Sequence, residues 1–174
     1  MKTLPCDCML LLIDTCFWNH CNELSGANIW DFRSILSKFR WGYTSAVLDE
    51  IKHYKLDRYV PVDQALLMPV TQAELLGLQK RDALFSSFDL ADQTLIAAAV
   101  REQALILTDD TPLQLECMGL NVPALKLPVF MLRLIKDGLA EKPVFSRSLR
   151  FWEENGRYRK VDLKRWKKEL QFLQ

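Results

Sequence analysis

The sequence predicts an α/β protein, a three-layer α/β/α sandwich with a parallel sheet, plus C-terminal helices. Short apolar runs alternate with longer stretches of helical periodicity, which is typical of chains in which each parallel strand is followed by a helix. At 174 residues and 49% hydrophobic content, the chain can bury one substantial core. We therefore expect residues 1–142 to form the main domain, with residues 143–174 as a basic helical extension packed on it.

The first part of the chain supplies two expected strands and two expected helices. Residues 9–13 form an uninterrupted apolar run that predicts a buried strand, and Asp14 follows it directly. Periodicity predicts a helix over residues 29–40 and a second over about residues 45–54. Residues 65–70 can form a strand, and Pro69 indicates that it ends there or lies at a sheet edge.

The middle of the chain carries the clearest helix start. Thr71 and Glu74 form a capping box, in which each side chain accepts a hydrogen bond from the other residue's backbone N–H. A longer helix is expected over residues 90–103. The apolar run at residues 104–107 follows at once and predicts a second buried strand.

Three further elements are expected before the extension. Thr111 is predicted to cap a short helix that runs towards Met118, with Pro112 in its first turn. Residues 122–127 form the last strand candidate. Residues 129–136 predict a helix that Gly138 ends.

The extension reads as two amphipathic helices, because its apolar residues recur at helical spacing and no further strand is evident. We interpret it as an added helical layer or a dimer contact. The two apolar stripes are Phe145, Leu149 and Trp152, and Leu163, Trp166 and Leu170.

Charge is distributed unevenly along the chain. The net charge is only +1, but residues 147–168 hold nine basic and three acidic residues, so this stretch carries +6 and the remainder −5. A basic end joined to an acidic body is expected of a protein that grips a polyanion. A solvated face on two terminal helices explains the same pattern equally well.

The sequence favours a cytoplasmic protein with reduced thiols. No apolar run approaches the roughly 18 residues of a membrane span, and residues 9–13 are too short for a signal-peptide core. Five cysteines, an odd number, argue against a disulfide framework. Four of them crowd the first 21 residues beside His20, but their spacing is not that of paired zinc knuckles, so small buried hydrophobes are the better interpretation: Cys6, Cys8, Cys16 and Cys21.

Acidic residues follow two of the predicted strands. Asp14 ends the first apolar run, and Asp109 and Asp110 come just after the strand at residues 104–107. In a parallel sheet these positions lie at the same edge, where ligands bind. Taken singly, each position is explained as well by ordinary strand ends and helix caps.

Two more carboxylates lie on helix faces expected to point inward. Glu50 shares a stripe with Val47, Ile51 and Tyr54, and a carboxylate on a buried stripe needs a cation or a metal as partner. Asp92 continues a stripe of buried residues in the helix at residues 90–103. Asp89 is the better candidate for the cap of that helix.

Other catalytic classes lack their signatures. There are only two histidines, and no G-x-S-x-G, P-loop or G-x-G-x-x-G motif, so triad hydrolysis, nucleotide-triphosphate binding and dinucleotide chemistry are not indicated. A set of carboxylates suits hard cations such as Mg²⁺ or Mn²⁺. Such sites support phosphodiester hydrolysis.

Over residues 9 to 125 the chain resembles the PIN-domain nucleases, many of whose prokaryotic members are VapC-type toxins. The order of the acidic segments carries the resemblance, and the stretch from Asp89 to Asp110 is its most specific part. The common Asn after Asp-Thr is Cys16 here, a change that bears on metal affinity and redox sensitivity. The segments are Leu-Ile-Asp14-Thr15, Leu-Asp-Glu50-Ile51, Asp89-Leu-Ala-Asp92 with its small apolar helix, and Thr108-Asp109-Asp110.

The resemblance implies a divalent-metal-dependent endoribonuclease. Asp14, Glu50, Asp92 and Asp110 would be the catalytic, metal-binding residues for Mg²⁺ or Mn²⁺. Thr108 would support them with its hydroxyl; Asp109 could exchange roles with Asp110, although the T-x-D alignment favours Asp110.

The resemblance also implies partners: an RNA substrate, an antitoxin protein if the chain is a toxin, and a second copy in a homodimer, with no membrane. The basic extension would contact RNA phosphates, and the residues expected to do so are Arg157, Arg159, Lys160, Lys164, Arg165 and Lys168.

Two alternatives make different predictions. A catalytically inactive PIN-like RNA- or protein-binding module would bind its partner without metal-dependent turnover. A receiver-like signalling domain would place its acidic pair after the first strand and a Lys after a late strand. Here the pair follows a later strand, and Lys126 is the only candidate for that Lys.

Overall fold

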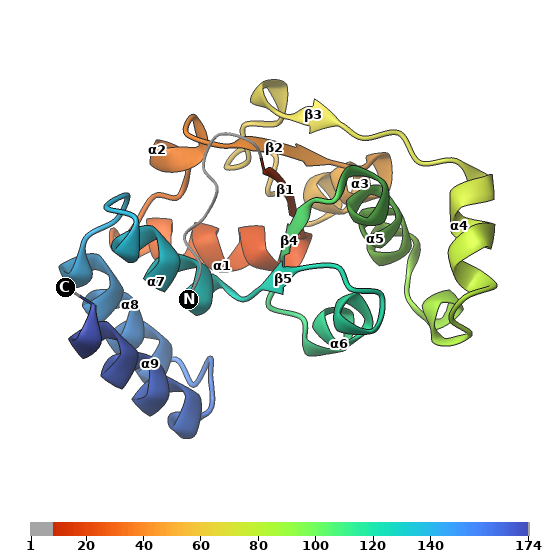
Figure 1. The fold of residues 1–174 in the computed structure, drawn as a ribbon. Coiled ribbons are helices and arrows are strands. Elements are labelled where there is room, and N and C mark those ends of the chain that lie inside the picture. The colour runs from red at the N-terminus through yellow and green to blue at the C-terminus, as the bar shows by residue number, and fades with distance from the viewer. Residues whose placement is uncertain (1–8, 174) are drawn as a thin grey trace.

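The computed structural model describes residues 9–173 and confirms the α/β class. Five parallel strands form one sheet in the order β3-β2-β1-β4-β5 (Figure 1). Leu12 of β1 lies opposite Gly42 of β2 on one side and Ile106 of β4 on the other. The strands are β1 (Leu10–Ile13), β2 (Arg40–Tyr43), β3 (Leu66–Leu67), β4 (Leu105–Leu107) and β5 (Ala124–Leu125).

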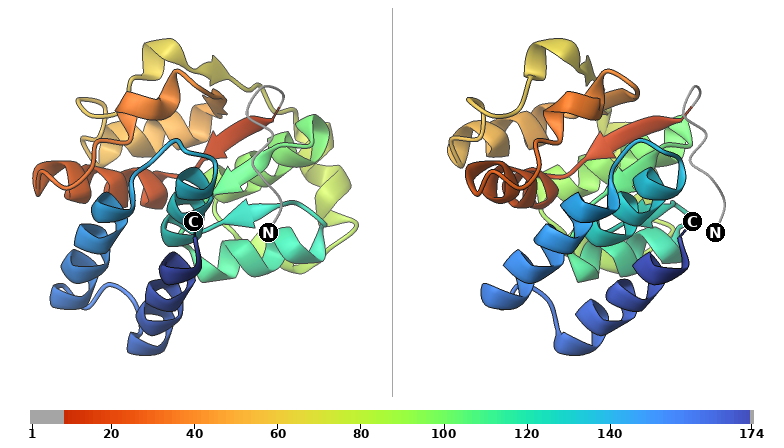
Figure 2. Two further views of the ribbon diagram at one scale, coloured as in Figure 1. Left: turned by 60° about the vertical axis from the view of Figure 1, so that its left-hand side comes forward. Right: turned by 90° about the vertical axis from the view of Figure 1, so that its left-hand side faces the viewer.

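Helices flank the sheet on both sides, which gives the three layers predicted from the sequence. Figures 1 and 2 show α1, α2 and α7 on one side, with α3, α5 and α6 on the other. The helices are α1 (Thr15–Gly26), α2 (Arg33–Leu36), α3 (Ser45–His53), α4 (Gln72–Gln79), α5 (Leu90–Glu102), α6 (Thr111–Gly119), α7 (Leu127–Lys136), α8 (Lys142–Glu154) and α9 (Lys160–Phe172), with short 3-10 turns at Val62–Gln64 and Leu84–Ser87. None of these helices, in the described part of the chain, is long and apolar enough to cross a bilayer.

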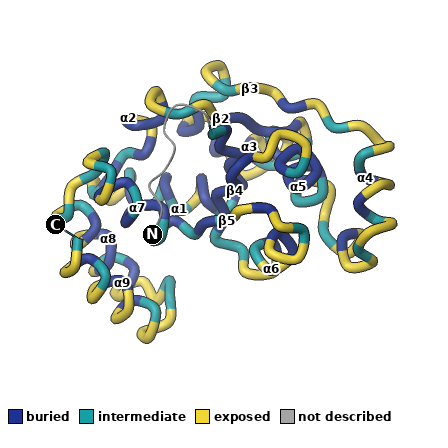
Figure 3. Tube along the Cα trace, in the orientation of Figure 1, coloured by how far each residue is buried: buried dark blue, intermediate teal, exposed yellow. Residues whose placement is uncertain are grey.

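The core is continuous across the sheet. All four residues of β1 are buried, as expected of the central strand of a parallel sheet covered on both faces (Figure 3). On one face, the rings of Phe17, Phe32 and Phe130 pack edge to face, with centroids 5.6 to 6.1 Å apart. This aromatic cluster joins α1 and α7 to the segment leading into α2.

Most predicted elements are confirmed, with small shifts at their ends. Thr71 and Glu74 form the capping box of α4, and Asp89 caps α5 by accepting a hydrogen bond from the Asp92 N–H at 3.0 Å. Strand β3 is a short edge strand that ends before Pro69. Gly138 has a φ of +70°, and this left-handed conformation turns the chain just after α7.

The segment between β1 and α3 was predicted incorrectly. A helix at residues 29–40 is wrong: only Arg33–Leu36 is helical, Arg40 begins strand β2, and helix α1 was missed. The Asn, Cys and aromatic residues of α1 have low helix propensity, so packing of its buried face stabilises it instead. Strand β2 was not predicted because Gly42 interrupts it. The glycine is needed there because a Cβ would lie only 2.5 Å from the Leu66 carbonyl oxygen of the neighbouring strand β3.

The start of α6 also differs from the prediction. Asp110, rather than Thr111, is the N-cap, and its Oδ1 accepts a hydrogen bond from the Leu113 N–H at 2.6 Å. Pro112 lies in the first turn, where its missing N–H is not needed. Asp110 therefore has a structural role in addition to any chemical one.

Helices α8 and α9, residues 142–172, form a C-terminal hairpin that packs on α7 (Figure 2). Both predicted apolar stripes are buried in it, including Trp152 at 1% exposure and Trp166 at 2%. The basic residues of α9 are mostly exposed on its outer side. The hairpin is thus an added helical layer with a charged surface.

Candidate active site

The four predicted carboxylates line one open pocket of about 370 Å³. The sheet order explains why, because β1 and β4 are neighbours and the Asp14 N–H donates to the Leu107 carbonyl at 3.0 Å. Helices α3 and α5 pack against each other and bring Glu50 and Asp92 to the same place. The lining residues are Asp14, Thr15, Cys16, Asn19, Glu50, Tyr54, Leu56, Asp89, Asp92 and Asp110.

Asp14 is the most buried of the four, with 6% exposure. Its Oδ2 accepts hydrogen bonds from the Thr108 hydroxyl at 2.6 Å and from the Cys16 thiol at 2.7 Å. Burial raises the pKa of Asp14, and these two donors only partly oppose that shift. Thr108, the residue that the resemblance assigns as a supporting hydroxyl, is fully buried and contacts Asp14 directly.

Cys16 belongs to the same network. Its sulfur lies 3.4 Å from the Thr108 hydroxyl and accepts a hydrogen bond from the Asp109 N–H at 3.3 Å. Burial, followed by the nearby charge of Asp14, raises the thiol pKa, so the group stays protonated and can donate to Asp14. Cys16, the residue that departs from the pattern of the PIN-domain nucleases that the chain resembles, therefore lies directly beside Asp14.

Glu50 and Asp92 face the pocket from two packed helices. The hydroxyls of Thr44 and Thr94, 2.7 Å apart, join the start of α3 to α5. Burial raises the pKa of Glu50. Burial, and then the charges of Asp14, Asp89, Asp110 and Glu50, raises the pKa of Asp92 to about 8. A carboxyl group that titrates near neutral pH is typical of functional sites.

The stripe predicted for α3 needs one correction. Val47 and Ile51 are fully buried and Glu50 is half-buried, but Tyr54 is 63% exposed and lines the mouth of the pocket. The helix ends at His53, so the ring of Tyr54 is not carried into the core. His53 is exposed.

The neighbouring residues Asp109 and Asp110 have different roles. Asp110 lines the pocket, whereas the Asp109 side chain, only 3% exposed, accepts hydrogen bonds elsewhere, from His20 and Tyr158. Of the two residues left as alternatives by the sequence, only Asp110 lines the pocket. Asp109 is a buried structural acceptor.

The pocket carboxylates have no cationic partner. No Lys or Arg within residues 9–173 forms an ion pair with Asp14, Glu50, Asp92 or Asp110. In the same part of the chain, no three His, Cys, Asp or Glu side chains lie close enough to form a ready-made metal cage. The four acids share a pocket without sharing a tight cluster.

Among the described residues, the cysteines near the N-terminus do not form a zinc site. Cys21 is fully buried and behaves as the small hydrophobe predicted, while Cys6 and Cys8 lie outside the residues that the structure describes. His20 contacts Asp109 rather than a thiol.

The predicted RNA contacts fall into two groups. Arg157 is held by Glu23, with N–O distances of 2.8 and 2.9 Å, and Arg159 pairs with Asp162 at 2.8 Å. Arg165 makes longer contacts to Asp162 and Glu169, at 3.6 and 3.8 Å. The other predicted contacts are exposed on α9: Lys160, Lys164 and Lys168.

Several pocket residues were not expected there from the sequence, among them Asn19, Tyr54 and Leu56. Asn19 was missed together with helix α1, and Tyr54 was assigned to the core. The spacing of Tyr54, four residues after Glu50, already indicated that the two side chains share a helix face.

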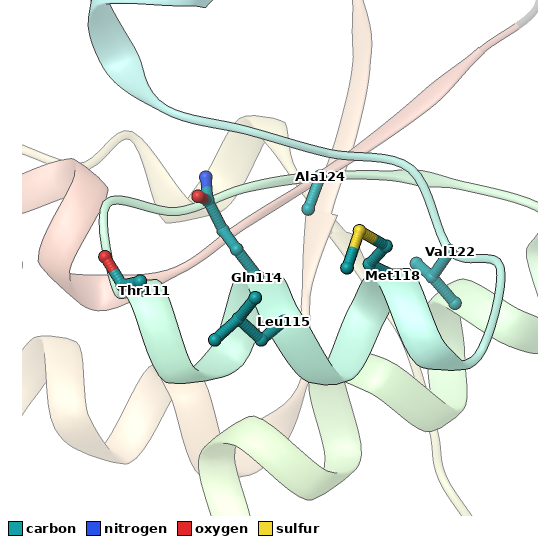
Figure 4. A pocket seen from close by; sticks show the side chains of 6 residues that line it. All are labelled: Thr111, Gln114, Leu115, Met118, Val122 and Ala124. Atoms are coloured by element: carbon teal, nitrogen blue, oxygen red, sulfur yellow. The ribbon is translucent and has the colours of Figure 1, made fainter. Parts of the chain in front are cut away.

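A second hollow lies between α6 and β5 (Figure 4). It contains no titratable side chain, so it offers no acid, base or metal ligand. Its lining residues are Thr111, Gln114, Leu115, Met118, Val122 and Ala124.

Comparison of the sequence with protein-family models gives no match, and comparison with curated proteins gives none either. The chemistry of the carboxylate pocket is therefore the basis for assigning a function.

Proposed function

We propose that this protein is a divalent-metal-dependent endoribonuclease of the PIN-domain kind, which hydrolyses RNA phosphodiester bonds with water as the nucleophile. One observation carries the proposal: four carboxylates from distant parts of the chain line one pocket, and no described Lys or Arg neutralises them. Such an arrangement is unfavourable for folding alone, because like charges repel in a half-buried site.

The donor set fits Mg²⁺ or Mn²⁺. Both ions prefer carboxylate oxygens, and Asp14 and Asp92 would be the central ligands, with Glu50 and Asp110 completing the site or orienting water. The pKa of Asp92, raised by burial and then by the neighbouring acids, fits this interpretation, since a cation would offset the charge of an ionised carboxylate there. When bound, such an ion supplies a Lewis acid that activates water and offsets phosphate charge.

The protein's own residues prepare this site. Thr108 and Cys16 donate to Asp14 Oδ2 and so hold its carboxylate in one orientation. Asp110 is fixed by its cap bond to the Leu113 N–H. Asp92, whose pKa is raised to about 8, holds a proton at neutral pH, and a bound cation would favour its ionised form.

RNA would be held from two directions. Lys160, Lys164 and Lys168 are exposed on α9, and we propose that they contact RNA phosphates. The exposed ring of Tyr54, at the mouth of the carboxylate pocket, can stack on a base of an unpaired strand.

The decisive experiment compares cleavage of mixed RNAs by purified wild-type protein in Mn²⁺ and in chelator. We expect cleavage only with the ion, and none with Asp14→Asn or Asp92→Asn, both of which should stay folded by circular dichroism. Full Mn²⁺-dependent activity in Asp14→Asn would exclude the mechanism.

A toxin role is part of the proposal and has its own test. Expression of the wild-type chain should arrest growth of a bacterial host, and expression of Asp14→Asn should not. A protein antitoxin would then be found as a partner that restores growth. Equal growth with both chains would exclude the toxin role and leave the nuclease assignment to the cleavage assay.

A second candidate is a catalytically inactive PIN-like module that binds RNA or protein. It is favoured by the lack of a ready-made metal cage in residues 9–173. This alternative predicts RNA binding that chelator does not change, and no cleavage under any metal. The receiver-like alternative is not favoured, since its acidic pair would follow β1 and the sheet order differs from the 2-1-3-4-5 of that fold.

A further inference from the structure

Asp109 lies where three segments of the chain meet. Its Oδ2 is 2.9 Å from His20 Nδ1 on α1, and its Oδ1 accepts a hydrogen bond from the Tyr158 hydroxyl at 2.9 Å. A longer bond of 3.4 Å comes from the Leu127 N–H at the start of α7. With 3% exposure, this carboxylate depends on those donors instead of water.

Tyr158 connects Asp109 to the C-terminal hairpin. The residue lies between α8 and α9, and its ring packs edge to face on Trp152 and Trp166, with centroids 5.2 and 5.0 Å away. The neighbouring Arg157 binds Glu23 of α1. The turn of the hairpin is therefore fastened to both α1 and the loop that follows β4.

That loop carries two site residues, one on each side of Asp109. Thr108 donates to Asp14, its hydroxyl accepts from the Asp110 N–H at 3.0 Å, and Asp110 lines the carboxylate pocket. A backbone shift at Asp109 would move both neighbours. The position of the hairpin turn is thus linked to the geometry of the pocket through three covalently adjacent residues.

We propose that His20, Asp109 and Tyr158 form a positioning cluster through which the C-terminal hairpin sets the loop at residues 108–110 and hence the affinity of the carboxylate pocket for a divalent cation. The inference rests on the proposed function for the identity of the ligand. Asp109 acts through Thr108 and Asp110 and is a positioning residue. The hairpin would therefore have two roles. Its lysines would contact phosphates, and its turn would hold the metal-binding loop at residues 108–110 in position.

The test measures Mn²⁺ affinity from the electron paramagnetic resonance signal of the free ion, in the full-length protein. Tyr158→Phe removes one hydroxyl donor, and we expect about a 10-fold loss of Mn²⁺ affinity, as is usual for residues that support metal ligands. Tyr43→Phe is the matched control, since it removes a hydroxyl bond of 3.2 Å to the Val62 carbonyl outside the pocket. The control should keep its affinity.

His20 allows a rescue experiment. His20→Ala should weaken Mn²⁺ binding, whereas His20→Asn, whose amide N–H can replace the Nδ1–H donor to Asp109, should recover most of it. Melting temperatures are measured alongside. A purely stabilising role predicts lower melting temperatures in Tyr158→Phe and His20→Ala with Mn²⁺ affinity unchanged, and that result would overturn the proposal.

Hydrogen exchange separates this inference from the proposed function. Faster exchange of the amides at residues 108–110 in Tyr158→Phe, and not in Tyr43→Phe, is expected with or without metal. If the wild-type protein binds no Mn²⁺, the nuclease assignment fails; faster exchange then still supports the positioning cluster, and unchanged exchange overturns it.

Discussion

The carboxylate pocket and the C-terminal hairpin both concentrate charge of one sign, but they differ in whether those charges are paired with opposite charges. In the hairpin, Arg157, Arg159 and Arg165 each meet a carboxylate within 4 Å. In the pocket, four half-buried or buried acids face one another, and no described Lys or Arg pairs with them.

The difference distinguishes charges that serve folding from charges that await a ligand. Paired arginines fasten the hairpin, and the hydrogen bond from Arg159 lowers the pKa of Asp162. In the pocket, burial and then the charges of the neighbouring acids raise the pKa of Asp92, and acids without a described cationic partner cost stability. A group retained at such a cost is expected to be needed for binding or catalysis.

The largest effect expected is stabilisation of the pocket by cation. Mn²⁺ at about 100 times its dissociation constant should raise the free energy of unfolding by about 2.7 kcal/mol, and chelator should remove the gain. Asp14→Asn should gain little, because a central ligand is lost. Urea unfolding measures the gain in unfolding free energy for both proteins. An equal gain in the wild-type protein and in Asp14→Asn would show that the ion binds outside the pocket.

The second effect is a gain in stability when one repelling charge is removed. Folded Asp92 keeps its proton up to about pH 8, whereas in the unfolded chain it ionises near 3.8, so stability falls as pH rises between these values. Because solvent screens part of the repulsion at this half-buried site, we expect Asp92→Asn to stabilise the metal-free protein by about 1–3 kcal/mol at neutral pH.

The pH dependence provides the check. The advantage of Asp92→Asn should vanish below about pH 4, where the native carboxyl is protonated in both states. The matched control is Asp162→Asn, which removes a paired acid and should give no gain at any pH. Urea unfolding in chelator at several pH values measures both variants, and destabilisation by Asp92→Asn at neutral pH would contradict the account of the pocket.

A third effect concerns the lysines of the hairpin that form no ion pair with any described residue. In an Asp14→Asn background that cannot cleave, Lys160→Ala with Lys164→Ala should lower the slope of log affinity against log salt by about 1.4 for single-stranded RNA, if each contacts one phosphate. Lys80→Ala, an exposed lysine at the end of α4, is the control. If the slope, measured by fluorescence anisotropy, does not change, α9 is not part of the RNA interface.

The smallest effect is expected for a paired surface residue. Arg165 is 58% exposed and its contacts to Asp162 and Glu169 are long, so Arg165→Ala should change the free energy of unfolding by less than about 0.5 kcal/mol. Chemical denaturation is sufficient to measure it. A loss above about 1 kcal/mol would show that the hairpin depends on this charge network as much as on its buried tryptophans.

Local patterns predicted much of the fold. The apolar run of β1, the capping box at Thr71 and the glycine after α7 are decided by neighbours in sequence, and all three are confirmed. Helix α1 was missed because its own residues have low helix propensity, and strand β2 because Gly42 interrupts it. Packing of Phe17 and Trp18 stabilises α1, and close approach to β3 explains Gly42.

The sequence by itself determined the α/β class, the strand-end acids and the acids on helix faces, since hydrophobic periodicity and strand ends are local properties. Only the tertiary structure decided that β1 and β4 are neighbours, which of Asp109 and Asp110 faces the pocket, and that Tyr54 and Asn19 line it. Strand order and the direction of a side chain after a strand depend on contacts between residues far apart in the chain, and spacing along the sequence carries no record of those contacts.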